Sequence, residues 1–193
     1  MSNQLRFAIC GTSRAGKDTF AAILNKRLEE RGMAKATNLA FAAPLKQLYK
    51  MFFSHVETSE KPRDAYVTMG NAFREIDGDV WIYPLMSAAN EAWQKGNSII
   101  VTDTRYENEA NVLAERGFII IKVVADDFIR KERSNALGEE LDLNNQGDAE
   151  VGFIKEDLLV INNGEDDFKT LPLLADLAIN KALELKEATE SRD

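Results

Sequence analysis

Short apolar runs alternate along the chain with longer stretches in which apolar residues recur at helical spacing. Runs that are apolar almost throughout and end in glycine or polar residues indicate strands buried on both faces. This pattern predicts strands at residues 5–10, 36–41, 98–103, 118–126 and 157–163. The helical spacing predicts helices at residues 17–32, 44–53, 67–76, 79–96, 107–117, 127–135 and 167–193.

The alternation of strands and helices predicts an α/β fold with three layers, in which a parallel sheet carries helices on both faces. The 193 residues suit a single domain, 1–193. Two regions add to this domain, a small helical insert at about 42–95 and a lid at about 127–152. Within the lid, the segment 138–153 is polar and poor in core residues, which predicts a mobile flap.

Composition and charge narrow the range of partners. The chain is 45% apolar and 29% charged, as in soluble globular proteins, and its formal net charge is −8. Proteins that grip nucleic acid usually carry a basic face, so we expect small-molecule nucleotides as partners and no nucleic acid polymer. The single cysteine, Cys10, cannot form an intrachain disulfide, which fits a reducing compartment. With no signal-peptide pattern and no apolar run near ~20 residues, we expect a cytoplasmic protein without membrane contact.

The stretch between the first predicted strand and the first predicted helix has the spacing Gly11-x4-Gly16-Lys17. Glycines let backbone N–H groups approach anionic oxygens, and the following helix points its positive end at the same charge. A lysine adds a mobile charge for the β- and γ-phosphates of a nucleotide. The alternative is a glycine-rich turn with a surface lysine. We predict a phosphate-binding loop (P-loop), and hence a P-loop NTPase fold, with the ATP-binding residues Gly11, Thr12, Ser13, Arg14, Ala15, Gly16, Lys17, Asp18 and Thr19.

The residue after the P-loop lysine is usually serine or threonine, whose hydroxyl contacts Mg²⁺. Here it is Asp18, with Thr19 next. A carboxylate can hold Mg²⁺ through water, and Asp103 ends the strand predicted at 98–103, where ligands bind in parallel sheets. We predict metal binding by Asp18, Thr19 and Asp103, with Asp103 also catalytic. Alternatively, Asp103 caps the next helix.

The strings that define other P-loop classes do not occur in this sequence. A GTP switch needs D-x-x-G and N-K-x-D, and a transporter ATPase needs L-S-G-G-Q. The chain has instead a basic helix at 127–135, followed by the polar flap. Phosphoryl transfer needs positive charge around the moving group and exclusion of water, which lid arginines provide. We predict Arg130 and Arg133 as catalytic lid residues, a solvated helix face being the alternative.

Several strings occur in a characteristic order: GTSRAGKDTFA, FAAPLK, TMGNAFREIDGDVW, VTDTRYENEA and DLLVINNG. Together they resemble the phage-type deoxynucleoside monophosphate kinases, part of the P-loop nucleoside monophosphate kinase group. The resemblance covers about residues 5–164. The Gly-Lys-Asp-Thr form of the loop is common in that family. After the loop, the most specific element is D-x-R-x-x-N-E, which begins at Asp103.

The resemblance implies transfer of the γ-phosphoryl group of ATP to a deoxynucleoside monophosphate, with Mg²⁺ as cofactor, and it is compatible with a homodimer. It implies that Lys17 follows the phosphoryl group in flight and that the insert binds the acceptor. The implied acceptor-binding residues are Arg105, Arg74 and Lys46, with Phe41 and Trp81 flanking the pocket; Asn162, Asn163 and Gly164 would lie beside the adenine. For Arg74 and Lys46 an exposed helix position is the alternative, and the aromatic residues can equally belong to the core.

Two other functions remain open on the sequence alone. The first keeps the ATP site and changes the acceptor to dephospho-coenzyme A or another phosphorylated metabolite. The second is a nucleotide-binding regulator that hydrolyses slowly or not at all. An assay of acceptor-dependent ADP formation separates these functions from the deoxynucleoside monophosphate kinase. The base that is accepted and the choice between ribose and deoxyribose depend on a few pocket side chains that the pattern does not place.

Overall fold

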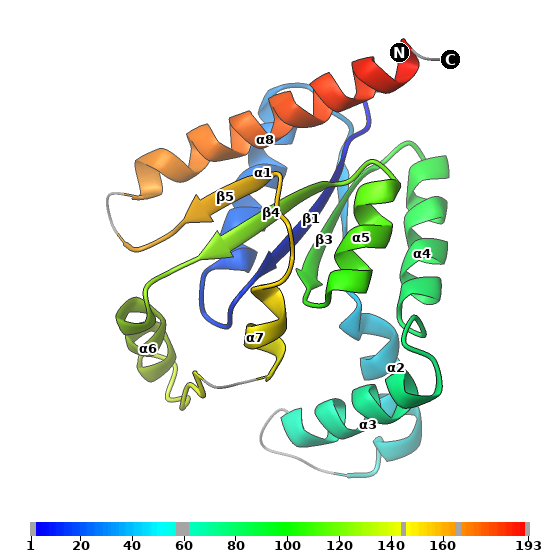
Figure 1. Ribbon diagram of the computed structural model, residues 1–193, viewed down its shortest axis with the longest axis vertical. Coiled ribbons are helices and arrows are strands. Elements are labelled where there is room, and N and C mark those ends of the chain that lie inside the picture. Colours follow the sequence, from blue (N-terminus) through cyan, green and yellow to red (C-terminus); the bar gives the residue numbers. More distant parts are fainter. Residues whose placement is uncertain (1–2, 57–61, 144–145, 165–166, 192–193) are drawn as a thin grey trace.

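A computed structural model describes residues 3–56, 62–143, 146–164 and 167–191. The described residues contain one parallel sheet of five strands in the order β2-β3-β1-β4-β5, as the sequence predicts for an α/β protein (Figure 1). The strands are β1 (Arg6–Gly11), β2 (Ala36–Leu39), β3 (Ser98–Thr104), β4 (Ile119–Val124) and β5 (Leu158–Ile161). β1 lies at the centre and pairs with β3 and β4. The three inner strands are the most apolar because helices cover both of their faces.

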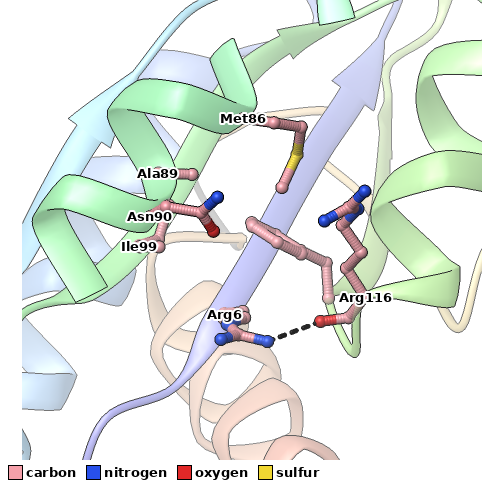
Figure 2. Close-up of a pocket in the computed structure, with 7 residues that line it drawn as sticks. Arg6, Met86, Ala89, Asn90, Ile99 and Arg116 are labelled. Carbon is pink, nitrogen blue, oxygen red and sulfur yellow. Dashed lines mark hydrogen bonds between the residues drawn. The ribbon is translucent and has the colours of Figure 1, made fainter. Parts of the chain in front are cut away.

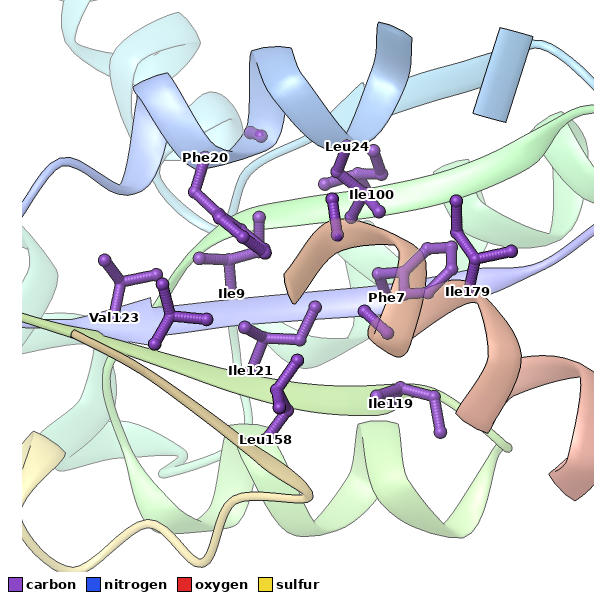
Figure 3. Close-up of a cluster of buried hydrophobic side chains, with 14 of the residues drawn as sticks. Phe7, Ile9, Phe20, Leu24, Ile100, Ile119, Ile121, Val123, Leu158 and Ile179 are labelled. Carbon is purple, nitrogen blue, oxygen red and sulfur yellow. The ribbon is translucent and has the colours of Figure 1, made fainter. Parts of the chain in front are cut away.

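Alternate residues of β1 point into two separate apolar clusters. Phe7 and Ile9 pack toward α1 (Lys17–Glu30) and α8 (Asp167–Glu190), as Figure 3 shows for the cluster around them. Ala8 and Cys10 pack on the opposite face, in the cluster that also holds residues of α4 (Ile82–Gln94) and α5 (Glu107–Glu115). Figure 1 shows these two helix pairs on opposite sides of the sheet. The fold is therefore the three-layer arrangement that the alternating sequence pattern predicts.

The remaining helices lie near the carboxyl ends of the strands, where Figure 1 shows them along the lower part of the molecule. They are α2 (Ala42–Phe53) and α3 (Arg63–Ile76) of the insert, and α6 (Asp127–Asn135) and α7 (Gln146–Val151) of the lid region. Parallel strands place their carboxyl ends at one edge of the sheet, so both additions lie at the edge where the P-loop follows β1. In the part of the chain that the structure describes, no helix combines the length and apolarity needed to cross a bilayer.

Two sequence predictions need correction. The segment 138–153, predicted to be poor in core residues, contains helix α7, whose last residue Val151 is buried in the core, as is Ile154 just after the segment; its mobility stays a prediction. A few apolar residues are enough to anchor this segment to the core. The sequence pattern does not reveal them, because polar residues surround them in the chain. The strand predicted at 36–41 ends at Leu39, because Phe41 already has helical backbone angles and precedes α2. That helix begins at Ala42, two residues before the predicted start.

Candidate active site

The P-loop joins β1 to α1. At two of its positions, Gly11 and Gly16, neighbouring atoms leave no room for a side chain. A Cβ atom on Gly11, at φ 150°, would lie 2.1 Å from the carbonyl oxygen of Val123 in β4. A Cβ atom on Gly16, at φ 96°, would lie 2.1 Å from Nδ2 of Asn162. Gly16 precedes α1, and no side chain caps this N-terminus. The first N–H groups of α1 therefore remain available to an anion, as the sequence predicts.

The side chain of Lys17 lies across the P-loop, where it is predicted to contact the phosphates of a nucleotide. Its ammonium group donates to the carbonyl oxygens of Gly11 and Thr12, at 2.9 Å each. Burial, and then the nearby guanidinium of Arg105, lower the pKa of Lys17 to about 8. The charge is thus held in place at a cost in solvation, which an incoming phosphate would offset. Asp18 and Thr19 follow on the exposed first turn of α1.

Asp103 has a contact that the sequence does not indicate. Its two carboxylate oxygens accept the backbone N–H groups of Phe41 and Ala42, at 2.7 and 3.0 Å. Asp103 therefore caps the N-terminus of α2, which is not the helix that follows it in the chain. Burial raises the pKa of Asp103, while these N–H groups and the charges of Arg105 and Lys46 oppose the rise. The carboxylate holds the insert against the end of β3.

The residues predicted to bind metal are compatible with Mg²⁺, because Asp18, Thr19 and Asp103 all offer hard oxygen donors. Each oxygen of Asp103 accepts one N–H and keeps a further lone pair. Within residues 3–56, 62–143, 146–164 and 167–191, no cluster of three or more His, Cys, Asp or Glu side chains could hold a metal by itself. Mg²⁺ at this edge would thus be held by one or two carboxylates together with nucleotide phosphates and water.

Two cations beside Asp103 have no carboxylate of their own. Arg105 is close enough to lower the pKa of Lys17, and Arg105 and Lys46 both act on Asp103 electrostatically. Among the described residues, neither side chain forms an ion pair or a hydrogen bond. Arg105 and Lys46 therefore place two positive charges near one buried carboxylate, and Arg105 also lies near Lys17 of the P-loop. This local positive charge contrasts with the net charge of −8 and suits a second anionic ligand.

The other predicted acceptor residues are bound within the protein. Arg74 lies 3.3 Å from the buried carboxylate of Glu109 and stacks 4.1 Å from the ring centre of Tyr106. Trp81 and Phe41 are only 4% exposed and belong to the apolar cluster between the sheet and α4. The indole N–H of Trp81 donates to the carbonyl of Gly70 at 3.4 Å. These three side chains shape the insert, and a role in stacking on a base stays a prediction.

Arg130 is buried against the P-loop. Its Nε donates to the carbonyl of Ser13 at 2.8 Å, and its other nitrogens pair with Asp127 and Asp148. The carboxylate of Asp148 in turn accepts the N–H of Ser13 at 2.9 Å and its hydroxyl at 3.0 Å. Sequence analysis missed Asp148, because it is one of many acidic residues in a polar segment. The pair Arg130–Asp148 joins α6 and α7 to the P-loop.

Arg133 and Asn162 hold the other side of the P-loop. Arg133 donates to the carbonyls of Arg14, Ala15 and Asn162, at 3.0 to 3.3 Å. Asn162 is 6% exposed, and its Nδ2 donates to the carbonyl of Ala15 at 2.9 Å. Asn163 accepts the N–H of Asp126 at 2.8 Å, and Gly164 follows it in the loop after β5. These contacts position the loop backbone, and a contact of Asn162, Asn163 or Gly164 with adenine stays a prediction.

The sequence comparisons identify the family. A family model described as an AAA domain matches residues 8–151, which is well over half of the chain. The chain therefore belongs to this family of P-loop NTPases. This agrees with the P-loop, the parallel sheet and the carboxylate of Asp103 at the carboxyl end of β3, as described above. No curated protein matches the sequence.

Solved structures of other proteins share the fold. Kti12 from Chaetomium thermophilum, solved with ADP-AlF3, is 15% identical, covers 93% of this chain and 97% of its own, and has a TM-score of 0.54. The protein APE1195 is 16% identical over 94% of this chain and 98% of its own, with a TM-score of 0.53. A gluconokinase from Sinorhizobium meliloti is 13% identical over 97% and 99%, with a TM-score of 0.52. These likenesses establish a fold of the P-loop kinase type and no substrate.

Proposed function

We propose that this protein is a kinase that transfers the γ-phosphoryl group of ATP to a deoxynucleoside monophosphate, with Mg²⁺. The observation that carries the proposal is the pair of cations Arg105 and Lys46 near Asp103, with Arg105 also near Lys17 of the P-loop. A nucleotide hydrolase needs charge for one phosphate chain only. Cations without an ion-pair partner among the described residues, just after β3 and on α2, would provide for a second phosphate, that of an acceptor.

The reaction has a simple balance. The bond between the γ-phosphorus of ATP and its bridging oxygen breaks, and a new bond forms to an oxygen of the acceptor phosphate, giving ADP and a nucleoside diphosphate. The amides of the P-loop and the ammonium of Lys17 would bind the donor phosphates. Arg105 would hold the acceptor phosphate in line and offset the repulsion between two anions. Mg²⁺, when bound, would neutralise charge on the donor phosphates.

The choice of a deoxynucleoside monophosphate rests on the resemblance of the strings around the P-loop, Asp103 and the insert. The insert offers an apolar hollow of about 410 Å³ between α2, α3 and α4, lined by Trp81, Phe73, Pro44 and Leu48 among others. A hollow of this size and character suits a flat, weakly polar group such as a base. Its position on the insert, which Asp103 anchors through Phe41 and Ala42, supports the proposal that the insert binds the acceptor.

A coupled assay tests this function directly. ADP formation is followed with ATP and Mg²⁺, with each of the four deoxynucleoside monophosphates and with dephospho-coenzyme A as acceptors. We expect acceptor-dependent turnover with at least one deoxynucleoside monophosphate. If none of the four raises ADP formation above the rate without acceptor, the proposed function is wrong. Turnover with dephospho-coenzyme A alone would assign the other acceptor class.

The role of Arg105 has its own test. Arg105→Ala removes a guanidinium that the described residues leave without a carboxylate, so the fold should persist. We expect the KM for the acceptor to rise about tenfold or more, the size of a lost charge-assisted hydrogen bond, with little change in the KM for ATP. Lys50→Ala, which removes an exposed cation from α2, is the matched control. Equal acceptor KM values in Arg105→Ala and Lys50→Ala would exclude Arg105 from the acceptor site.

A further inference from the structure

A second cluster of positive charge lies at the opposite end of the sheet from the P-loop. Arg6 begins β1, and Gly11 ends it five residues later, so the two ends are about 17 Å apart at ~3.3 Å per residue. Arg6 shares the face of β1 that carries Ala8 and Cys10, which is the face covered by α4 and α5. A charged side chain at the edge of this apolar layer needs a physical reason.

Part of the reason is that Arg6 is held between neighbours. Its guanidinium carbon lies 3.8 Å from the ring centre of Trp93 and 6.0 Å from that of Phe118. Its Nη1 donates to the carbonyl oxygen of Arg116 at 2.7 Å, at the C-terminus of α5, where a cation is favoured. These contacts fix the orientation of Arg6. They leave its other guanidinium nitrogens without a hydrogen-bond partner among the described residues.

The contacts that hold the guanidinium of Arg6 do not involve the guanidinium of Arg116. Figure 2 shows its guanidinium on the same hollow as Arg6, with the side chains of Met86 and Asn90 across from it. Among the described residues, the guanidinium of Arg116 has no ion pair or hydrogen bond, and Arg6 has no ion pair. Burial and the charge of Arg116 both lower the pKa of Arg6, which means that the two like charges act on one another. Two arginines without a carboxylate partner among the described residues therefore line one hollow, in a chain whose net charge is −8.

The hollow between them has room for a ligand. Its volume is about 170 Å³, far above the roughly 10–15 Å³ that a single water needs. Met86, Ala89, Ile99 and Phe118 form apolar walls, while the amide of Asn90 adds a polar group. Apolar walls on one side of the hollow reduce the screening of the attraction between an anion and the guanidinium groups, while Arg116 and Asn90 at its rim are exposed. Guanidinium groups match the oxygens of a phosphate two at a time.

We propose that Arg6 and Arg116, with Asn90, form a binding site for a phosphate-class oxyanion at the end of the sheet opposite the P-loop. The ligand is either free phosphate or the phosphoryl group of a small metabolite. It would neutralise two like charges and join the start of β1 to α4 and the end of α5. The site does not depend on the kinase function, since none of its residues belongs to the P-loop, to α2 or α3, or to the lid region.

Calorimetric titration with inorganic phosphate tests the site, with chloride at equal ionic strength as the reference. The double variant Lys17→Ala/Arg105→Ala is the background, so that binding at the P-loop and at the proposed acceptor site is weakened. We expect one phosphate to bind in this background. Adding Arg116→Gln should weaken the binding about tenfold, the size of a lost charge-assisted contact. Arg116→Gln is chosen because its guanidinium has no contact that the fold needs, whereas Arg6 also packs on Trp93. Lys26→Gln, an exposed cation on α1 across the sheet, is the matched control and should change nothing.

A second measurement places the ligand. The chain has five methionines, and the methyl signal of Met86, labelled with ¹³C in the unmodified protein, should shift on titration with phosphate. Repeating the calorimetry with glycerol 3-phosphate separates the two sources, because tighter binding of the ester indicates a phosphorylated metabolite and tighter binding of phosphate indicates the free ion. No saturable binding in the Lys17→Ala/Arg105→Ala background, equal affinity after Arg116→Gln, or an unmoved Met86 signal would each overturn the proposal.

Discussion

At the level of individual residues, the P-loop is defined by how little space its glycines have and by its backbone angles. Gly11 has no room for a side chain because the backbone of β4 lies against it, and Gly16 faces the amide of Asn162. Arg14 has φ 63°, the one positive value among the described residues other than glycine. It pairs with Glu139, which also pairs with Arg63 of α3. Glu139 thus joins the strained backbone position at Arg14 to α3 through two ion pairs.

The lowered pKa of Lys17 predicts a pH dependence of nucleotide binding. Phosphate stabilises the ammonium form, so the pKa of Lys17 rises when the nucleotide binds, and binding takes up a proton above pH 8. The affinity for MgATP should be nearly constant between pH 7 and about 7.5 and should fall as pH rises through about 8, toward tenfold per unit. Cys10, whose pKa is raised to about 11 chiefly by burial, does not titrate in this window.

Calorimetry or fluorescence titration from pH 7 to 9.5 measures this dependence. Lys17→Met, which lacks the titrating group, should bind MgATP more weakly and with no slope over the same range. A slope that persists in Lys17→Met, or a flat profile in the unmodified protein, would contradict the assignment.

The close approach of Gly11 to β4 predicts the cost of a single methyl group. Gly11→Ala should lower the free energy of unfolding by about 3 kcal/mol, because a backbone oxygen must move and the φ value is unfavourable to alanine. Gly117→Ala is the matched control, since Gly117 has φ 76° and nothing within 4 Å of an added Cβ. It should cost only about 1 kcal/mol. Urea unfolding of both variants measures the difference. Equal losses in the free energy of unfolding would show that the backbone of β4 can move away from the added methyl group.

At the scale of helices and strands, the active-site edge is assembled by contacts between elements that are distant in the chain. Asp103 at the end of β3 caps α2, and Glu109 in α5 binds Arg74 of α3. Asp148 in α7 holds both Arg130 of α6 and the P-loop. Each of these carboxylates is largely buried and joins two elements. The insert and the lid region are thus fixed to the sheet by charged groups as well as by apolar packing.

The buried pair Arg130–Asp148 predicts an asymmetric response to mutation. Both side chains are 6% exposed, so Asp148→Ala leaves a buried guanidinium without its main partner and should lower the free energy of unfolding by about 3 kcal/mol. Asp127→Ala removes the other carboxylate on Arg130, which is 64% exposed, and should cost under about 1 kcal/mol.

Chemical denaturation of Asp148→Ala, Asp127→Ala and the double variant Arg130→Met/Asp148→Leu tests this difference. The double variant, which removes both charges, should recover part of the loss in Asp148→Ala. Similar losses in the free energy of unfolding for Asp148→Ala and Asp127→Ala would mean that the buried ion pair of Asp148 stabilises the fold no more than the exposed one.

On the scale of the whole molecule, apolar side chains are unevenly distributed over the surface. Outside the hollow proposed for the acceptor, the insert exposes Phe52, Val67 and Ile76, at 58 to 86% of their surface. Exposed apolar groups gathered on adjoining helices are typical of surfaces that associate. The homodimer with which the resemblance is compatible would bury them, and we propose that the insert forms its interface.

Sedimentation or light scattering should then give about twice the chain mass of 21.6 kDa at micromolar concentration. Phe52→Glu would place a charge in the interface and should give the monomer. Leu173→Glu, at a position on α8 that is 68% exposed, is the matched control and should remain dimeric. A monomeric unmodified protein, or a dimer that survives Phe52→Glu, would exclude this interface.

The sequence by itself determined the features that depend on neighbouring residues. The apolar runs predicted the strands, because burial on both faces requires apolar side chains at every position, and the glycines and lysine of residues 11–19 predicted the phosphate loop that the family confirms. Only the tertiary structure decided what depends on distant residues. It placed Asp103 on the N-terminus of α2, 61 and 62 residues away, and Asp148 on Ser13, 135 residues away. A carboxylate has the same side chain whether it caps a helix, pairs with arginine or faces water, so its role is fixed only when folding brings its partner to it.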